Sequence, residues 1–113
     1  MKPEEQRIAI AEILGWTQIT HNNYDHRTYR RELVGQTPNG VTNQTILPDY
    51  LNDLNAMHEA EKLIRSKLNK RNGQVYAYLY ESELSNLTGG EPIYATAAQR
   101  AEAFLKTIGQ WND

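Results

Sequence analysis

The sequence predicts one α+β domain, spanning residues 1–113, in which helices pack against a small sheet. Three amphipathic helical patterns alternate with strand-like segments, and two Asn-Gly pairs mark turns between them. The chain has 113 residues, of which 39% are hydrophobic, and this suits a single core. We expect a small antiparallel or mixed sheet sandwiched between helices, in the order helix, hairpin, helix, strand, helix.

The first helix is expected over residues 3–14. Pro3 suits a first helical turn, because its missing N–H has no helical partner there. Glu4 and Glu5 follow at the positive end of the helix dipole, and apolar residues then recur on one side. Gly15 is a natural stop.

A hairpin is expected next. Residues 16–20 have strand composition, and residues 21–26 form a polar stretch typical of a loop. Residues 28–34 alternate between apolar and charged side chains, as a half-buried strand does. The turn signal Asn39-Gly40 then predicts a return strand over residues 41–47.

The second helix is predicted over residues 53–69, with Asn52 or Asp53 as its cap. After it, residues 74–81 alternate in the manner of a strand, with tyrosines on one side and smaller apolar residues on the other. Residues 82–87 are either one helical turn or irregular. Residues 93–94 are expected to add a short strand.

The last helix is expected over residues 96–109. Thr96 and Gln99 have the spacing of a capping box, and Gly109 ends the pattern. Its apolar stripe is centred on Phe104 and Ile108, which we expect to be buried. Glu102 and Lys106 have the spacing of an ion pair on the other side.

Two segments and the end of the first helix resemble small phage and prophage proteins of the phage ABA sandwich family. The segments are residues 47–62, LPDYLNDLNAMHEAEK, and residues 95–111, ATAAQRAEAFLKTIGQW; the helix end is Gly15-Trp16. The resemblance covers about half of the chain. It implies helices on both faces of a sheet and a phage or prophage origin, but no catalytic residue.

Charge and composition narrow the functional classes. Twelve Lys and Arg face 14 Asp and Glu, so the net charge of −2 disfavours nucleic-acid binding, which depends on neutralising phosphates. The absence of cysteine excludes disulfides and thiolate metal sites. The chain shows neither an apolar leader segment nor a membrane-spanning run. Together with the phage origin that the resemblance implies, this leads us to expect a protein of the bacterial host's cytoplasm.

No catalytic or metal motif is present. His21 and His26 do not have a zinc spacing, and we expect neither a metal nor another cofactor. His58 begins a segment that departs from the H-E-x-x-H motif, because Lys62 replaces the second histidine. Glu61 lies at the edge of the apolar stripe, where a carboxylate is suited to proton transfer but more often caps a backbone group or pairs with an arginine. We do not expect an enzyme.

The sequence instead favours binding of another macromolecule, with a protein as the expected partner. Tyrosines and arginines are common anchors of protein interfaces. The tyrosine face of the expected strand is core if a helix covers it and a contact surface if none does; we favour core. The candidate contact residues are Tyr24, Arg27, Asp49, Tyr50, Tyr76, Tyr78 and Tyr80.

An alternative function is binding of a small anionic ligand such as a nucleotide. The N-terminus of the last helix, residues 95–97, is the candidate site, because free N–H groups at a helix start attract anions. Ordinary capping by Thr96 is the more common role of such a segment.

Overall fold

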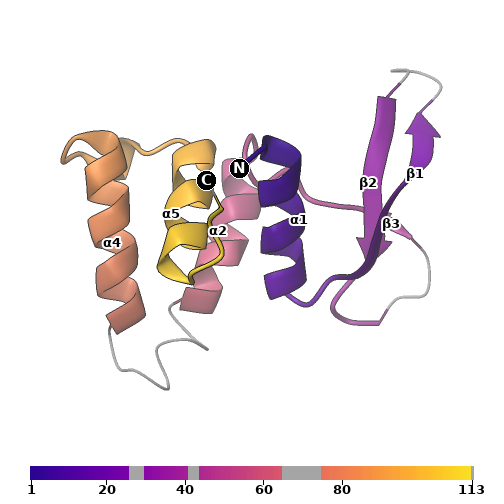
Figure 1. Ribbon diagram of the computed structural model, residues 1–113, viewed down its shortest axis with the longest axis horizontal. Helices are drawn as coiled ribbons and strands as arrows, with labels where there is room; N and C mark the ends of the chain where they lie inside the picture. The colour runs from indigo at the N-terminus through magenta and orange to yellow at the C-terminus, as the bar shows by residue number, and fades with distance from the viewer. Residues whose placement is uncertain (26–29, 41–43, 65–74, 113) are drawn as a thin grey trace.

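The chain is an α+β protein. The computed structural model describes all residues except 26–29, 41–43, 65–74 and 113 (Figure 1). The described residues form four α-helices, one 3₁₀ turn and a three-stranded antiparallel sheet. The molecule is elongated, with extents of 42 × 29 × 25 Å.

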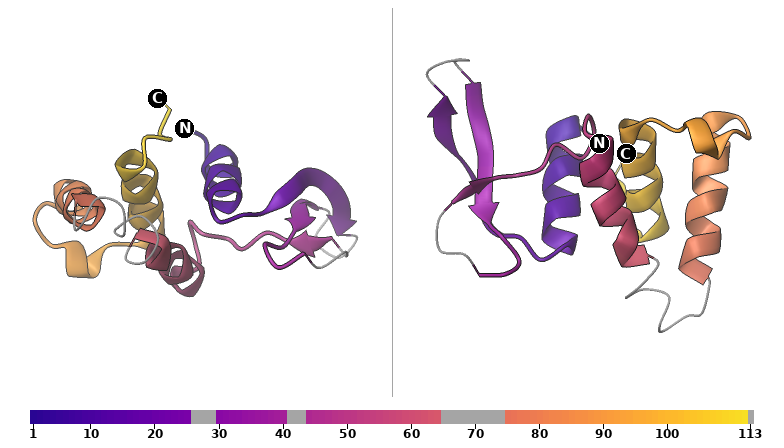
Figure 2. Two further views of the ribbon diagram at one scale, coloured as in Figure 1. Left: turned by 90° about the horizontal axis from the view of Figure 1, so that it is seen from below. Right: turned by 180° about the vertical axis from the view of Figure 1, so that it is seen from behind.

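The four helices stand side by side, and the sheet lies beyond them at one end of the molecule (Figures 1 and 2). Their bounds are Pro3–Ile13 for α1, Leu54–Leu63 for α2, Val75–Thr88 for α4 and Ala97–Thr107 for α5. In the view from below, α2 and α5 face each other between α4 and α1. The described helices thus lie on one side of the sheet, whereas we expected helices on both faces.

The largest correction concerns residues 74–81, which we predicted to form a strand. Val75–Thr88 is a helix of 14 residues, α4, and it also contains the segment 82–87. In a helix Tyr78 points away from Tyr76 and Tyr80, so the three tyrosines do not share a face. Because this central strand is absent, the sheet consists of the hairpin strands alone.

The sheet has the order β1-β2-β3, with both neighbouring pairs antiparallel. Its strands are β1 (Thr17–Asp25), β2 (Arg30–Gln36) and β3 (Thr45–Ile46). The predicted polar loop at residues 21–26 is therefore wrong for residues 21–25, which extend β1. Residue 26 and part of the predicted return strand, residues 41–43, lie outside the described residues.

The turn signal after β2 is confirmed. The N–H of Gly40 donates to the carbonyl of Thr37 at 3.1 Å. Gly40 has φ +79°, a left-handed conformation that glycine adopts without a steric penalty. The chain then returns through β3, where Ile46 pairs with Val34.

The starts of α1, α2 and α5 agree with the sequence signals. The Asp53 carboxylate accepts from the N–H groups of Asn55 and Ala56, so Asp53 caps α2. Thr96 and Gln99 form both hydrogen bonds of the capping box. The predicted part of the second helix beyond residue 64 lies outside the described residues.

The core forms where α1, α2 and α5 meet. Ile10, Met57 and Phe104, one from each of these helices, are fully buried. Leu33 and Leu47, from β2 and from the residue after β3, join the same cluster and attach the sheet to the helices. Phe104 thus has the predicted position, while Ile108 is only partly buried.

The expected short strand at residues 93–94 is also wrong. Pro92–Tyr94 is a 3₁₀ turn, η2, which lies between α4 and α5. Ile93 and Tyr94 are 80% and 78% exposed, so they do not contribute to the core.

Candidate functional site

The proposed contact residues divide into buried and exposed groups. Tyr50 and Tyr80 are core residues, Tyr76 is partly buried, and Tyr78 is 72% exposed. Asp49 is exposed, and its carboxylate accepts hydrogen bonds from the amide of Asn52. Tyr24 lies in β1, but its side chain is outside the described structure. Arg27 lies entirely outside the described residues.

The corner at Tyr50 is structural. Arg7 on α1 donates to the carbonyl oxygens of Leu47 and Pro48, which holds the corner against α1. The Tyr50 side chain enters the core, and its burial raises the pKa of Tyr50 to about 12. Only 2% of Tyr50 is exposed, so a partner that binds this structure does not contact its side chain.

A polar cluster connects α2, α4 and α5 around Glu61. Tyr80 donates its hydroxyl hydrogen to Glu61 Oε2 at 2.7 Å. The Arg100 guanidinium donates to the same oxygen at 3.0 Å. His58 Nδ1 lies 2.8 Å from the other oxygen, Oε1. Both oxygens of this nearly buried carboxylate therefore have partners within the protein.

Arg100 extends the cluster toward η2. Its Nε donates to the carbonyl of Ala95 at 3.3 Å, and its Nη2 lies 3.5 Å from the carbonyl of Pro92. Burial, followed by the hydrogen bond to Glu61, raises the pKa of Tyr80 well above its usual range. Tyr80 thus remains a neutral donor near neutral pH, and the cluster serves as a structural bridge between the helices.

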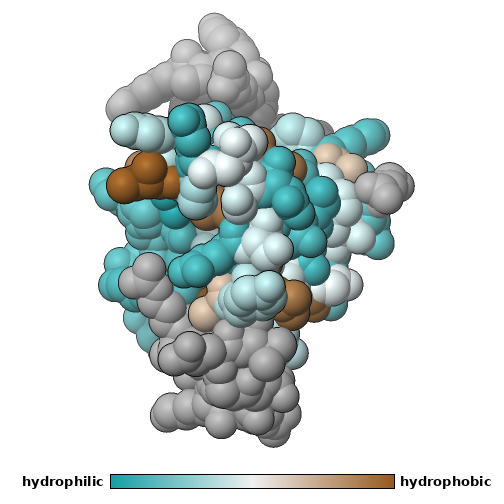
Figure 3. Space-filling model, turned by 90° about the vertical axis from the view of Figure 1, so that its left-hand side faces the viewer, coloured by the Kyte–Doolittle hydropathy of each residue, from teal (hydrophilic) through white to brown (hydrophobic). Residues whose placement is uncertain are grey.

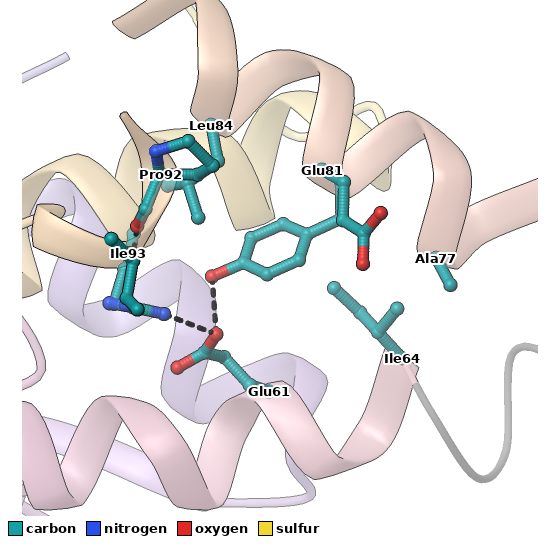
Figure 4. A pocket seen from close by; sticks show the side chains of 9 residues that line it. Glu61, Ile64, Ala77, Glu81, Leu84, Pro92 and Ile93 are labelled. Carbon is teal, nitrogen blue, oxygen red and sulfur yellow. Dashed lines mark hydrogen bonds and ion pairs between the residues drawn. The ribbon is translucent and has the colours of Figure 1, made fainter. Parts of the chain in front are cut away.

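Above this bridge the surface is hollowed between α2, α4 and η2 (Figure 4). The hollow has a volume of about 250 Å³. Glu61 reaches into it from α2, and Pro92 and Ile93 close it on the η2 side. Its other apolar walls come from Ile64, Ala77 and Leu84, and the exposed Glu81 stands on its rim.

A second, more polar hollow lies on the other side of the bridge. It has a volume of about 290 Å³ and is lined by His58, Glu61, Lys62 and Arg100. The Lys62 ammonium is 2.8 Å from the Glu59 carboxylate. Since Arg100 and Lys62 both have acidic partners, this hollow has no strong preference for an anion.

Several large apolar side chains are exposed on α4 and η2. We call Tyr78, Leu79, Ile93 and Tyr94 the α4–η2 surface; each is at least 41% exposed. Figure 3 views the molecule from the α4 end, where hydrophobic patches stand among hydrophilic side chains. Ile93 also lines the hollow, whereas Tyr78 points away from Tyr80, another lining residue.

Sequence reasoning identified Tyr78 but missed Ile93 and Tyr94. These two residues were interpreted as a strand, although Pro92 before them favours a turn start as much as an extended segment. It also missed Arg100, which is 39 residues away from Glu61. No local signal indicates which arginine completes such a pair.

The start of α5, the alternative anion site, is already capped. The Gln99 N–H donates to Thr96 Oγ1 at 3.1 Å, and the Gln99 side chain accepts from the Thr96 N–H at 2.9 Å. An anion would compete with this capping box for the same N–H group. Within the described ranges, no three acidic or histidine side chains are grouped as metal ligands.

Among the described helices, none is both long and apolar enough to cross a lipid bilayer. No protein-family model, curated protein or solved structure compared with the chain matches it.

Proposed function

We propose that this chain is a small accessory protein of a phage or prophage, which acts in the cytoplasm of the bacterial host by binding another protein. The observation that carries the proposal is the α4–η2 surface. Two tyrosines and two aliphatic side chains are exposed there, and one of them, Ile93, lines a hollow. The resemblance of residues 47–62 and 95–111 to small phage proteins supports the proposed origin.

The chemistry of these side chains supports binding. Tyrosines bury a large area at low cost in side-chain entropy, and a few such residues commonly dominate the energy of an interface. Tyr94, at 78% exposed, and Ile93, at 80%, give up little internal packing when a partner covers them. Both are thus suited to contact a partner.

The state of Glu61 supports binding over catalysis. A general acid or base needs an oxygen that faces a substrate within hydrogen-bond distance. Both oxygens of Glu61 are instead engaged, by Tyr80, Arg100 and His58. The capping box at Thr96 likewise gives no support to the alternative of a small anionic ligand.

The test is affinity capture from host lysate with purified wild type and with Ile93→Ser and Tyr94→Ser. We expect each variant to capture at least about tenfold less of the partner than the wild type does, because interface anchors contribute that much affinity. The matched control is Ile46→Ser, which removes a 54% exposed isoleucine on β3, far from α4. Equal capture by all four proteins would contradict the proposal for this surface.

A second arm tests catalysis directly. The wild type is screened for turnover of nucleotides, esters and phosphoesters. Turnover that disappears in a folded Glu61→Gln or His58→Ala variant would refute a purely binding role.

A further inference from the structure

We infer that the hollow between α2, α4 and η2 and its rim bind a basic segment of the partner protein. One aliphatic side chain of the partner enters the hollow, and its neighbouring Lys or Arg side chains face the Glu81 carboxylate. This inference rests on the proposed function and specifies the chemistry of the partner.

The size and lining of the hollow favour a single apolar side chain. Pockets for drug-sized ligands start at roughly 300 Å³, and the volume here is about 250 Å³. The walls include the side chains of Ile64, Leu84 and Ile93, so an aliphatic group would be desolvated against aliphatic groups. A hollow of this kind resembles the anchor pockets that interface hot spots fill.

The charge around the hollow favours a cationic partner. Among the described residues, three charged side chains line it: Glu61, Glu81 and Arg100. Inside the hollow, the charge of Glu61 is balanced by Arg100 at 3.0 Å. Within the described part of the chain, no Lys or Arg forms an ion pair with Glu81, so its charge faces outward.

An exposed tyrosine adds to this preference. Lys and Arg side chains bind over the faces of tyrosine rings by cation–π attraction. Tyr94, which is 78% exposed, follows the lining residue Ile93 on η2. Because Arg100 balances Glu61, Glu81 leaves the lining with a net negative charge, which repels the phosphates of nucleic acids. A basic protein segment is therefore the occupant that fits the hollow.

The probe is the peptide Gly-Lys-Lys-Leu-Lys-Lys-Gly, acetylated and amidated at its ends. Its binding is followed by NMR titration of the full chain labelled with nitrogen-15. We expect saturable shifts centred on the amides of Ala77, Glu81, Leu84 and Ile93. A peptide with Gly in place of Leu should bind at least about fivefold more weakly, and one with Glu in place of every Lys should not bind.

Two variants test the charge and the hollow separately. Glu81→Lys should weaken binding of the Lys-Leu peptide at least about fivefold. The matched control is Glu12→Lys, which makes the same charge change at an exposed position near the end of α1. Ala77→Trp should fill the hollow and abolish binding; Ile93→Ser, on the exposed turn, tests the same wall without risk to the core.

The outcomes separate the inference from the proposed function. Equal weakening by Glu12→Lys and Glu81→Lys, shifts centred elsewhere, or equal binding of the Glu peptide would overturn the inference. So would an oligonucleotide that produces the same shifts. If Ile93→Ser and Tyr94→Ser release the captured partner while Glu81→Lys does not, the proposed function stands and the basic-segment inference fails. If none of the three releases it, both fail.

Discussion

Among the described residues, Glu61 is the one charged residue that is buried. Its side chain is 10% exposed and that of Arg100 is 14% exposed. Removing two such charges from water costs several kcal/mol, which their attraction offsets only when the remaining hydrogen-bond groups also have partners. Tyr80 and His58 supply those partners to Glu61, and the carbonyls of Ala95 and Pro92 supply them to Arg100.

We therefore expect Glu61→Ala to lower the free energy of unfolding by roughly 3–5 kcal/mol, because Arg100 loses its counterion and the Tyr80 hydroxyl loses its acceptor. Glu61→Gln should cost less, since its amide oxygen still accepts from Tyr80. Urea melts measure both. In a cycle with Arg100→Met, the double variant should lose clearly less stability than the sum of the single losses; simple additivity would disprove the coupling.

Tyr50 gives a pH-dependent prediction. Its pKa is raised from 10.0 to about 12 in the folded state, mainly by burial. The neutral phenol is therefore favoured by folding, and this stabilisation is complete below pH 10 and lost as the pH rises toward 12. This shift of about two pKa units corresponds to a stabilisation of about 3 kcal/mol at most.

The measurement compares urea melts of wild type and Tyr50→Phe at neutral pH and near pH 12. The wild type should lose more stability across this range than the variant does, because phenylalanine does not ionise. The comparison removes the contribution of the other titrating groups. An identical loss in both proteins would show that Tyr50 does not contribute to alkaline unfolding.

The sequence placed Glu61 correctly at the edge of the apolar stripe of α2. It also indicated that a carboxylate in this position more often caps a backbone group or pairs with an arginine than transfers a proton. It did not identify Arg100, because that contact depends on how α2 and α5 pack, and packing is not encoded in local spacing. The burial of Tyr50 was missed for the same reason.

At the scale of elements, α4 is a helix whose sequence also satisfies the pattern of a strand. The alternation of tyrosines with smaller residues over 74–81 satisfied the rule for a strand. A helical pattern was present as well: Ala77, Tyr80, Leu84 and Leu87 recur at helical spacing, and all four pack into or against the core. The packing of this face against α5 decides between the two patterns.

The two tyrosines of α4 test this assignment. Tyr80→Ala should cost roughly 3–5 kcal/mol of unfolding free energy, because a buried ring is removed. Tyr78→Ala should change stability by no more than about 0.5 kcal/mol, because that ring is 72% exposed. Urea melts of the two variants distinguish a helix from a strand. On a strand Tyr78 and Tyr80 would share a face, so similar losses of stability in both variants would contradict the helix.

The elements with end signals were predicted well. Asp53, Thr96 and Gly40 each stop or start an element through hydrogen bonds between residues at most four apart. Such contacts are local and therefore visible in the sequence. The length of β1 was not visible in the sequence, because the polar residues 21–25 become part of the strand only by pairing with β2 in the hairpin.

At the scale of the whole molecule, the helices contribute most of the core and the sheet contributes little of it. Helix α5 packs against α1, α2 and α4, so it forms the centre of the helical part. The sheet lies beyond α1 and joins the core through Leu33 and Leu47. The sequence predicted the α+β class but not this arrangement, since the place of the sheet follows from the absence of a strand at residues 75–81.

This arrangement predicts that the two parts respond differently to damage at the centre. Phe104→Ala should lower the free energy of unfolding by roughly 3–5 kcal/mol, because Phe104 is fully buried in α5. Amide hydrogen exchange then reports each part: protection in Ala101 and Leu105 should fall by that same amount. The β1–β2 amides, which are expected to exchange through local opening, should keep their rates.

The control for this experiment is Ile46→Ala, at an exposed position of β3. It should leave the protection of α5 unchanged, because Ile46 is remote from the helical core. An equal fall of protection in α5 and in the β1–β2 pair of Phe104→Ala would show that sheet and helices unfold as one unit. In that case Leu33 and Leu47 would couple the two parts more tightly than their small share of the core implies.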